Sequence, residues 1–217
     1  LLAHAGAPSV RFVHHAGLRD SSMAHAALAD VMLMTPEEFL VYPLENVKAE
    51  LVRGELRVSP PGGAPHGSAG ARLIVMLAAH VDPRKLGRVF GDGIGYQLLQ
   101  LPRTVRVPDA SFVRADQLPP EGIRAGLFKF APAIAIEVLS PSETASELQE
   151  KLDDYRVAGT ALVWVVDPVK RTVMVVGRDA PLTVLREGER LSGGEVLPEF
   201  SCAVEEIFEG IARDLRE

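Results

Sequence analysis

An apolar run broken by one carboxylate stands in the middle of the chain: Ala133-Ile134-Ala135-Ile136-Glu137-Val138-Leu139, followed at once by Ser140-Pro141-Ser142. A short apolar run with such boundaries is typical of a strand covered on both faces, as in the parallel or mixed sheets of α/β proteins. An ionised Glu137 inside that strand is costly unless a cation meets it. The alternative is a carboxylate at the strand end that reaches solvent or caps the next turn.

The residues after Glu137 predict a helix and then a second buried strand. Thr144 and Glu147 have the spacing of a capping box, and Gly159 is a C-terminal stop signal. The apolar residues 161–166 follow at the length of a strand. Strand, helix and strand of this length form a βαβ unit, so we expect two parallel neighbouring strands joined by a right-handed crossover.

Capping and turn residues predict the helices and the hairpin that precede this unit. Thr35 followed by Pro36 predicts the start of a short helix. Arg53-Gly54 lies between two alternating segments and predicts a tight hairpin over residues 49–58. A helix is expected from His66 to about Val81, with Asp82-Pro83 ending it.

The remaining segments read mostly as short strands. Pro108-Asp109 is expected to interrupt one strand that resumes directly afterwards, and residues 114–131 form a long loop. We therefore expect an α/β protein with a central mixed sheet, flanking helices and C-terminal hairpins. The predicted segments are strands at 89–90, 96–99, 104–107 and 110–113, hairpin strands at 172–176 and 182–185, and a final helix at 204–208.

Length and composition predict one globular domain. A chain of 217 residues with 47% hydrophobic and 24% charged residues suffices for one well-buried domain. Residues 1–33, rich in Ala and His, are interpreted as an N-terminal extension outside a domain of residues 34–217. No apolar stretch approaches the roughly 20 residues of a membrane span, so no membrane partner is expected. Cys202 is the only cysteine, which fits a cytoplasmic location.

Three residues combine into one candidate site. Asp109 sits between two strand segments, Glu137 lies in the central strand, and Lys151 lies on the helix that follows. On a helical wheel Lys151 falls about 60° from Leu148 and about 40° from Tyr155, so it borders the buried face. A lysine there either swings its amine toward the sheet or snorkels and covers apolar surface.

Two carboxylates and one lysine are the arrangement expected for magnesium-dependent phosphodiester hydrolysis. Mg²⁺ prefers hard oxygen ligands and keeps several waters, so one or two carboxylates suffice to hold it. Such a cation polarises the phosphate and lowers the pKa of a bound water. A nearby lysine orients that water or stabilises developing charge.

The chain resembles the Uma-two family of restriction-endonuclease-like proteins over about residues 35–208. The block from Glu137 to Ser142, with its downstream lysine, tyrosine and glycine, is the most specific part of this resemblance. The residues that carry it, in family order and spacing, are Glu50-Leu51-Val52-Arg53-Gly54-Glu55-Leu56, Ser59-Pro60, His66, Pro108-Asp109, Glu137-Val138-Leu139-Ser140-Pro141-Ser142, Lys151, Tyr155, Gly159 and Trp164-Val165-Val166-Asp167-Pro168.

The resemblance implies a PD-(D/E)-x-K nuclease core with Asp109 and Glu137 as metal ligands. The general pattern places a lysine two residues after the acid, but Leu139 stands there, and in this family the role is thought to pass to Lys151. The resemblance adds further candidates for the site, which are Glu50, His66 and Tyr155. His66 alternatively caps the start of its helix.

Two functions follow as hypotheses. The first is an endonuclease that uses Mg²⁺ or Mn²⁺ and acts on nucleic acid, with DNA as the expected substrate. The second is a non-catalytic binding or assembly module on the same scaffold, which the net charge of -6 favours. The late hairpins also predict a homodimer. Five residues either form a basic rim near Asp109 or are solvated loop charges: Arg103, Arg106, Arg114, Arg124 and Lys129.

Overall fold

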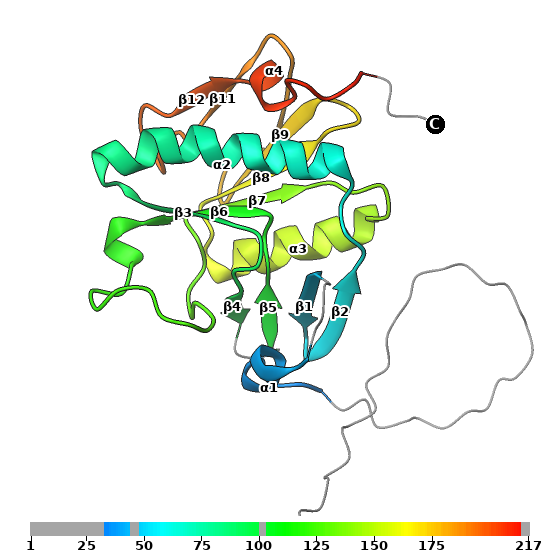
Figure 1. Cartoon of the computed structure of the whole chain (residues 1–217), viewed down its shortest axis with the longest axis vertical. Coiled ribbons are helices and arrows are strands. Elements are labelled where there is room, and N and C mark those ends of the chain that lie inside the picture. The colour runs from blue at the N-terminus through cyan, green and yellow to red at the C-terminus, as the bar shows by residue number, and fades with distance from the viewer. Residues whose placement is uncertain (1–32, 44–47, 100–102, 214–217) are drawn as a thin grey trace, which may run out of the picture.

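A six-stranded mixed sheet lies between two long helices (Figure 1). The computed structural model describes residues 33–43, 48–99 and 103–213. Within them α2 (Ala64–Arg84) and α3 (Ala145–Ala158) cover opposite faces of this sheet, which confirms the predicted fold class. The strand order is β10 (Thr183–Arg186), β9 (Thr172–Gly177), β8 (Leu162–Asp167), β7 (Ile134–Val138), β6 (Ala110–Arg114) and β3 (Gly87–Gly91).

The predicted βαβ unit forms the centre of the sheet. β7 and β8 pair in parallel, with Ile134 opposite Leu162, and α3 connects them. The other strand pairs of this sheet are antiparallel. Gly159 takes a left-handed conformation with φ of 96°, which ends α3 at the predicted position. These signals are local, so the sequence was sufficient to predict this unit.

The N-terminus of α3 is held by the predicted capping box, and its removal is a test of helix stability. Thr144 Oγ1 accepts from the Glu147 amide, and the Glu147 carboxylate accepts from the Thr144 amide. Thr144→Ala should lower the free energy of unfolding by about 1 kcal/mol. The measurement is urea denaturation. The control is Ser146→Ala, which removes an exposed hydroxyl in the same turn and should leave stability unchanged. An equal loss in both variants would contradict the assignment.

The helix α2 continues beyond the residue at which the sequence predicted its end. The prediction that Asp82-Pro83 stops it near Val81 is wrong, because α2 extends to Arg84 with Pro83 in its last turn. The Lys85 amide donates to the Asp82 carbonyl and the Leu86 amide donates to the Val81 carbonyl, as in a Schellman motif. These bonds and the burial of Val81 offset the hydrogen bond that Pro83 cannot make.

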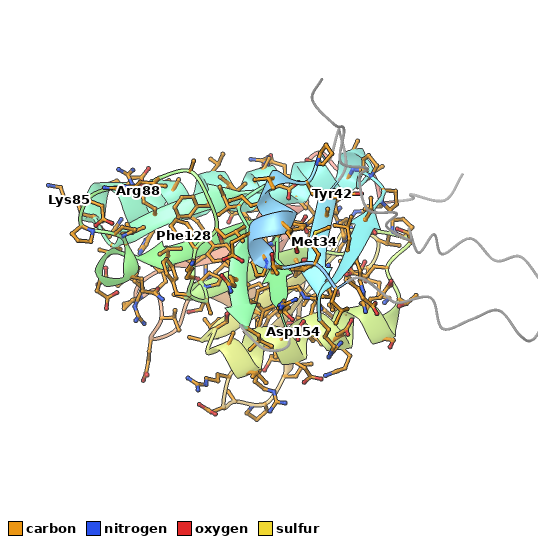
Figure 2. All side chains as sticks on the ribbon, turned by 90° about the horizontal axis from the view of Figure 1, so that it is seen from below. Met34, Tyr42, Lys85, Arg88, Phe128 and Asp154 are labelled. Atoms are coloured by element: carbon orange, nitrogen blue, oxygen red, sulfur yellow. The ribbon has the colours of Figure 1, made fainter. Side chains whose placement is uncertain are left out.

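A second sheet of four strands packs its apolar face on α1 (Pro36–Val41). This apolar face includes Leu51 and Val105, which lie in one buried cluster with Met34 (Figure 2). The order of the strands is β2 (Glu55–Ser59), β1 (Lys48–Val52), β5 (Thr104–Arg106) and β4 (Tyr96–Leu99). Side chains alternate along a strand, so Glu50 and Arg106 point to the opposite face, toward α3.

The chain passes from the small sheet to the large one at Pro108-Asp109. The expectation that residues 110–113 resume the preceding strand is wrong, because β5 pairs with β1 and β4 while β6 pairs with β3 and β7. Pro108 has no amide hydrogen to continue the ladder. The Asp109 amide instead donates to the Ile136 carbonyl of β7 over 3.0 Å. The crossover therefore brings Asp109 beside the strand that carries Glu137.

The C-terminal part adds a small third sheet against the α2 side of the large one. It pairs β11 (Arg190–Ser192) with β12 (Ser201–Ala203), and α4 (Val204–Ile207) follows at the predicted position. The loop at 114–131 contains one 3-10 turn, η1 (Ala115–Gln117). The predicted N-terminal extension lies outside the described residues apart from Leu33. Among the residues that the structure describes, no helix is long and apolar enough to cross a membrane.

Candidate active site

Glu137 is buried on the face of β7 that α3 covers. The opposite side of the strand is apolar, since Ile134, Ile136 and Val138 belong to the cluster under α2. Glu137 has an exposed fraction of 1% and accepts a hydrogen bond of 2.7 Å from the Tyr155 hydroxyl. It therefore neither reaches solvent nor caps a turn, and burial raises the pKa of its carboxyl.

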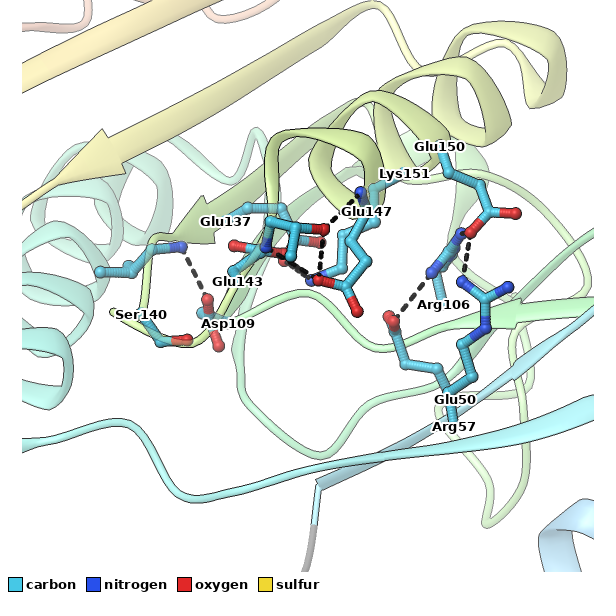
Figure 3. A network of polar contacts seen from close by, with 12 residues as sticks. Glu50, Arg57, Arg106, Asp109, Glu137, Ser140, Glu143, Glu147, Glu150 and Lys151 are labelled. Atoms are coloured by element: carbon cyan, nitrogen blue, oxygen red, sulfur yellow. Dashed lines mark hydrogen bonds and ion pairs between the residues drawn. The ribbon is translucent and has the colours of Figure 1, made fainter. Parts of the chain in front are cut away.

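Lys151 reaches the sheet and does not snorkel away from it. Its Nζ lies 3.2 Å from Glu137 Oε2 and 2.8 Å from Glu143 Oε1 (Figure 3). Burial disfavours the ammonium, but the field of Glu137, Glu50 and Glu143 outweighs it and raises the pKa of Lys151. Lys151 and Tyr155 lie one helical turn apart, so both reach Glu137 from the same face of α3.

Asp109 is fixed by the backbone of the strand that carries Glu137. Its Oδ2 accepts a hydrogen bond of 2.7 Å from the Val138 amide, so the two acidic residues lie side by side. Burial alone would raise the pKa of Asp109, but His66 and Lys48 outweigh that effect and hold the pKa well below its usual value. Asp109 thus remains ionised although only 6% of it is exposed.

His66 lines the site and is not the cap of its helix. The N-cap of α2 is Gly63, with no side-chain hydrogen bond, whereas His66 Nε2 lies 3.3 Å from Asp109 Oδ2. The hydrogen bond to Asp109 raises the pKa of His66. A Cβ at Gly62 would fall 2.4 Å from the imidazole ring, so the loop before α2 closes over His66 only with glycine at this position.

Lys48 contributes a second ammonium that the sequence interpretation missed. It lies on β1, and its Nζ is 2.6 Å from Asp109 Oδ1 and 3.8 Å from Asp92 Oδ1. Burial disfavours its charge, but Glu137, Asp109 and Glu50 together raise the pKa of Lys48. A signal was present in the sequence, because residues two apart on a strand share a face and Lys48 precedes Glu50 by two.

Glu50 is held by Arg106, and within the described residues it forms no hydrogen bond to Asp109 or Glu137. Its Oε2 accepts a hydrogen bond of 2.9 Å from Arg106 Nη1, and its Oε1 accepts one of 2.9 Å from the Val107 amide. Arg106 Nη2 also donates to Asp154 Oδ2 over 2.6 Å. For Arg106 both alternatives, a basic rim near Asp109 and a solvated loop charge, are wrong, because its exposed fraction is 1%.

The Arg106 network extends outward to the edge of the small sheet. Glu150 on α3 lies 3.8 Å from Arg106 and forms an ion pair with Arg57 (Figure 3). It also forms an ion pair with Arg53. These contacts join α3 to the hairpin of β1 and β2. Side chains of α3 therefore pair with the charged residues on this face of the small sheet. These pairs fix Glu50 beside the site.

The profile of the Uma-two (Uma2) family, described as "putative restriction endonuclease", matches residues 36–205. This chain belongs to the Uma-two family. The family match covers α1, both larger sheets and the residues placed around Glu137. No curated protein sequence matches the chain.

A solved crystal structure has the same fold. It is described as a "putative nuclease" belonging to DUF820 from Anabaena variabilis, and it superposes with a TM-score of 0.72. The match has 22% sequence identity and covers 81% of this chain and 97% of the neighbour. At that identity the likeness establishes the fold, and the roles of the residues depend on the geometry described above.

The carboxylates of this Uma-two protein suit a hard divalent cation. Asp109 and Glu137 offer oxygen ligands from adjacent backbone positions of the crossover and β7. Within residues 33–43, 48–99 and 103–213, no group of three or more His, Cys, Asp or Glu side chains is arranged as metal ligands. Two carboxylates completed by water match the preference of Mg²⁺ or Mn²⁺ and not that of Zn²⁺.

Proposed function

We propose that this protein is a metal-dependent endonuclease that hydrolyses phosphodiester bonds, with DNA as its substrate. The observation that carries the proposal is the contact set around Glu137. This set brings a second carboxylate, Asp109, and the ammonium of Lys151 to one strand end. Asp109 and Glu137 would hold Mg²⁺ or Mn²⁺, which supplies Lewis-acid activation of the phosphate and of water.

The protein side chains position the reacting groups in this proposal. The Tyr155 hydroxyl and the Val138 amide orient the carboxylates of Glu137 and Asp109, respectively. Lys151 orients the attacking water and offsets charge that develops on the phosphate. His66 approaches Asp109 from α2 and lines the substrate side of the site. The homodimer and the cytoplasmic location predicted from the sequence stay predictions.

The test is cleavage of supercoiled plasmid, single-stranded DNA and RNA by the purified protein with Mg²⁺, Mn²⁺ or EDTA. We expect DNA cleavage with either ion and none with EDTA. Asp109→Asn should reduce the rate by at least about 10³-fold, because it removes one of two ionised ligands. The measurement is the initial rate of plasmid relaxation.

A matched control separates loss of the site from loss of the fold. Asp167 is another poorly exposed aspartate of the large sheet, and its Oδ1 caps the turn after β8 by accepting from the Val169 and Lys170 amides. Asp167→Asn should retain cleavage. Wild-type rates in Asp109→Asn would reject the proposal. Metal binding without cleavage of any substrate would favour the binding module.

A further inference from the structure

The ammonium of Lys48 lies among carboxylates from three separate elements. Asp109 comes from the crossover, Glu137 from β7 and Glu50 from β1, and all three contribute to the electrostatic field at Lys48. The side chain of Lys48 is 18% exposed, so little water screens these charges. The acidic residues around Lys48 form a position that suits a divalent cation. The ammonium of Lys48 already occupies this position with a positive charge.

The two oxygens of Asp109 have different partners. Oδ2 accepts from the Val138 amide and faces His66, whereas Oδ1 contacts Lys48 at 2.6 Å. The oxygen that is free of backbone bonds is therefore the one that Lys48 holds. Lys151 differs in this respect, because its ammonium forms its ion pairs within the described residues with Glu137 and Glu143 and not with Asp109.

We propose that Lys48 is a built-in counter-ion that competes with the divalent cation for Asp109. Loading of the site requires its ammonium to leave Asp109 Oδ1. Asp92 lies 3.8 Å from Nζ, and its side chain is 59% exposed, so a second acceptor stands on the solvent side. The inference rests on the proposed function, because it takes Asp109 and Glu137 as the ligands of the cation.

Electrostatics sets the expected sign of the effect. A positive charge next to a doubly charged ion weakens binding of that ion, and removal of the charge strengthens it. Without a cation, two buried carboxylates side by side repel each other, and Lys48 offsets part of this repulsion. Lys48 therefore stabilises the metal-free protein and lowers its affinity for metal.

The experiment compares Mn²⁺ binding by the wild type, Lys48→Gln and Lys48→Arg by titration calorimetry, with thermal unfolding in EDTA and in saturating Mn²⁺. Glutamine keeps a hydrogen-bond donor toward Asp109 without the charge, and arginine keeps the charge. Lys48→Gln should bind Mn²⁺ about tenfold more tightly, as expected for loss of one adjacent charge. Lys48→Arg should bind no more tightly than the wild type.

Thermal unfolding separates competition from a structural role. Lys48→Gln should unfold at a lower temperature than the wild type in EDTA, and saturating Mn²⁺ should remove that difference. A lysine that is needed only for folding would lower both temperatures equally. The control is Lys170→Gln, which removes an exposed ammonium 3.3 Å from Asp167 and should leave Mn²⁺ affinity unchanged.

The outcomes also separate this inference from the proposed function. If the wild type binds Mn²⁺ and Lys48→Gln binds with equal or lower affinity, the competition is rejected and the metal site stands. If neither protein binds Mn²⁺, the metal site itself is rejected and the competition with it. Tighter binding in Lys48→Gln, together with unchanged binding in Lys48→Arg and Lys170→Gln, supports the inference.

Discussion

Replacing Glu137 by glutamine is expected to abolish metal-dependent cleavage and leave the fold intact. The amide keeps the oxygen that accepts from the Tyr155 hydroxyl, but it removes the charge that would bind a cation in the proposed site. We expect the initial rate of plasmid cleavage to fall by at least about 10³-fold. The free energy of unfolding should fall by less than the roughly 3–5 kcal/mol that a buried ion pair loses with one partner, because Lys151 keeps Glu143.

A glutamate in an ion pair far from the site serves as the control for Glu137→Gln. Glu187 accepts from Arg171 over 2.6 Å and from Arg213 over 2.8 Å near the C-terminal hairpin. Glu187→Gln should preserve cleavage. Retention of wild-type cleavage in Glu137→Gln would remove Glu137 from the mechanism, and collapse of its stability would assign it a structural role.

The largest stability effect is expected from Arg106. Replacing it by methionine leaves Glu50 and Asp154 in the interior without their common cation. Removal of one partner from a buried ion pair lowers the free energy of unfolding by about 3–5 kcal/mol. Urea denaturation followed by circular dichroism measures this loss. Cleavage assays on the remaining folded protein report whether Glu50 stays in place.

The exposed pair of Arg156 and Asp153 provides the comparison for Arg106. Arg156 lies on the same helix as Asp154, and its guanidinium is 3.3 Å from Asp153. Both side chains are about half exposed or more, so Arg156→Met should change stability by about 0–1 kcal/mol. Similar losses of unfolding free energy in both variants would show that the buried Arg106 network adds no more stability than an exposed ion pair.

The part of the fold that the sequence predicted is governed by local signals. The apolar runs of β7 and β8 and the capping box of α3 each specify their own conformation, and their order then fixes a parallel pair. The helical wheel likewise placed Lys151 at the border of the buried face, but it left open whether the amine reaches the sheet or snorkels. These predictions needed no knowledge of which distant segments meet.

The features that the sequence did not predict depend on contacts between distant segments. The end of α2 is an exception, since it was misplaced for a local reason: the turn after Pro83 is held by backbone bonds to Asp82 and Val81 and by the burial of Val81. Arg106 was read as a surface charge because its partner Asp154 lies 48 residues away. Lys48 was missed because its contact with Asp109 spans 61 residues.

The crossover at Pro108-Asp109 has a consequence for how the protein opens. Asp109 is bonded to β7 of the large sheet, and Lys48 of the small sheet is bonded to Asp109. β1 of the small sheet therefore cannot separate from the large sheet without breaking the contact between Lys48 and Asp109. Local unfolding of β1 and opening of the candidate site are therefore coupled, and a cation that displaces Lys48 from Asp109 should loosen this link and speed amide exchange in β1.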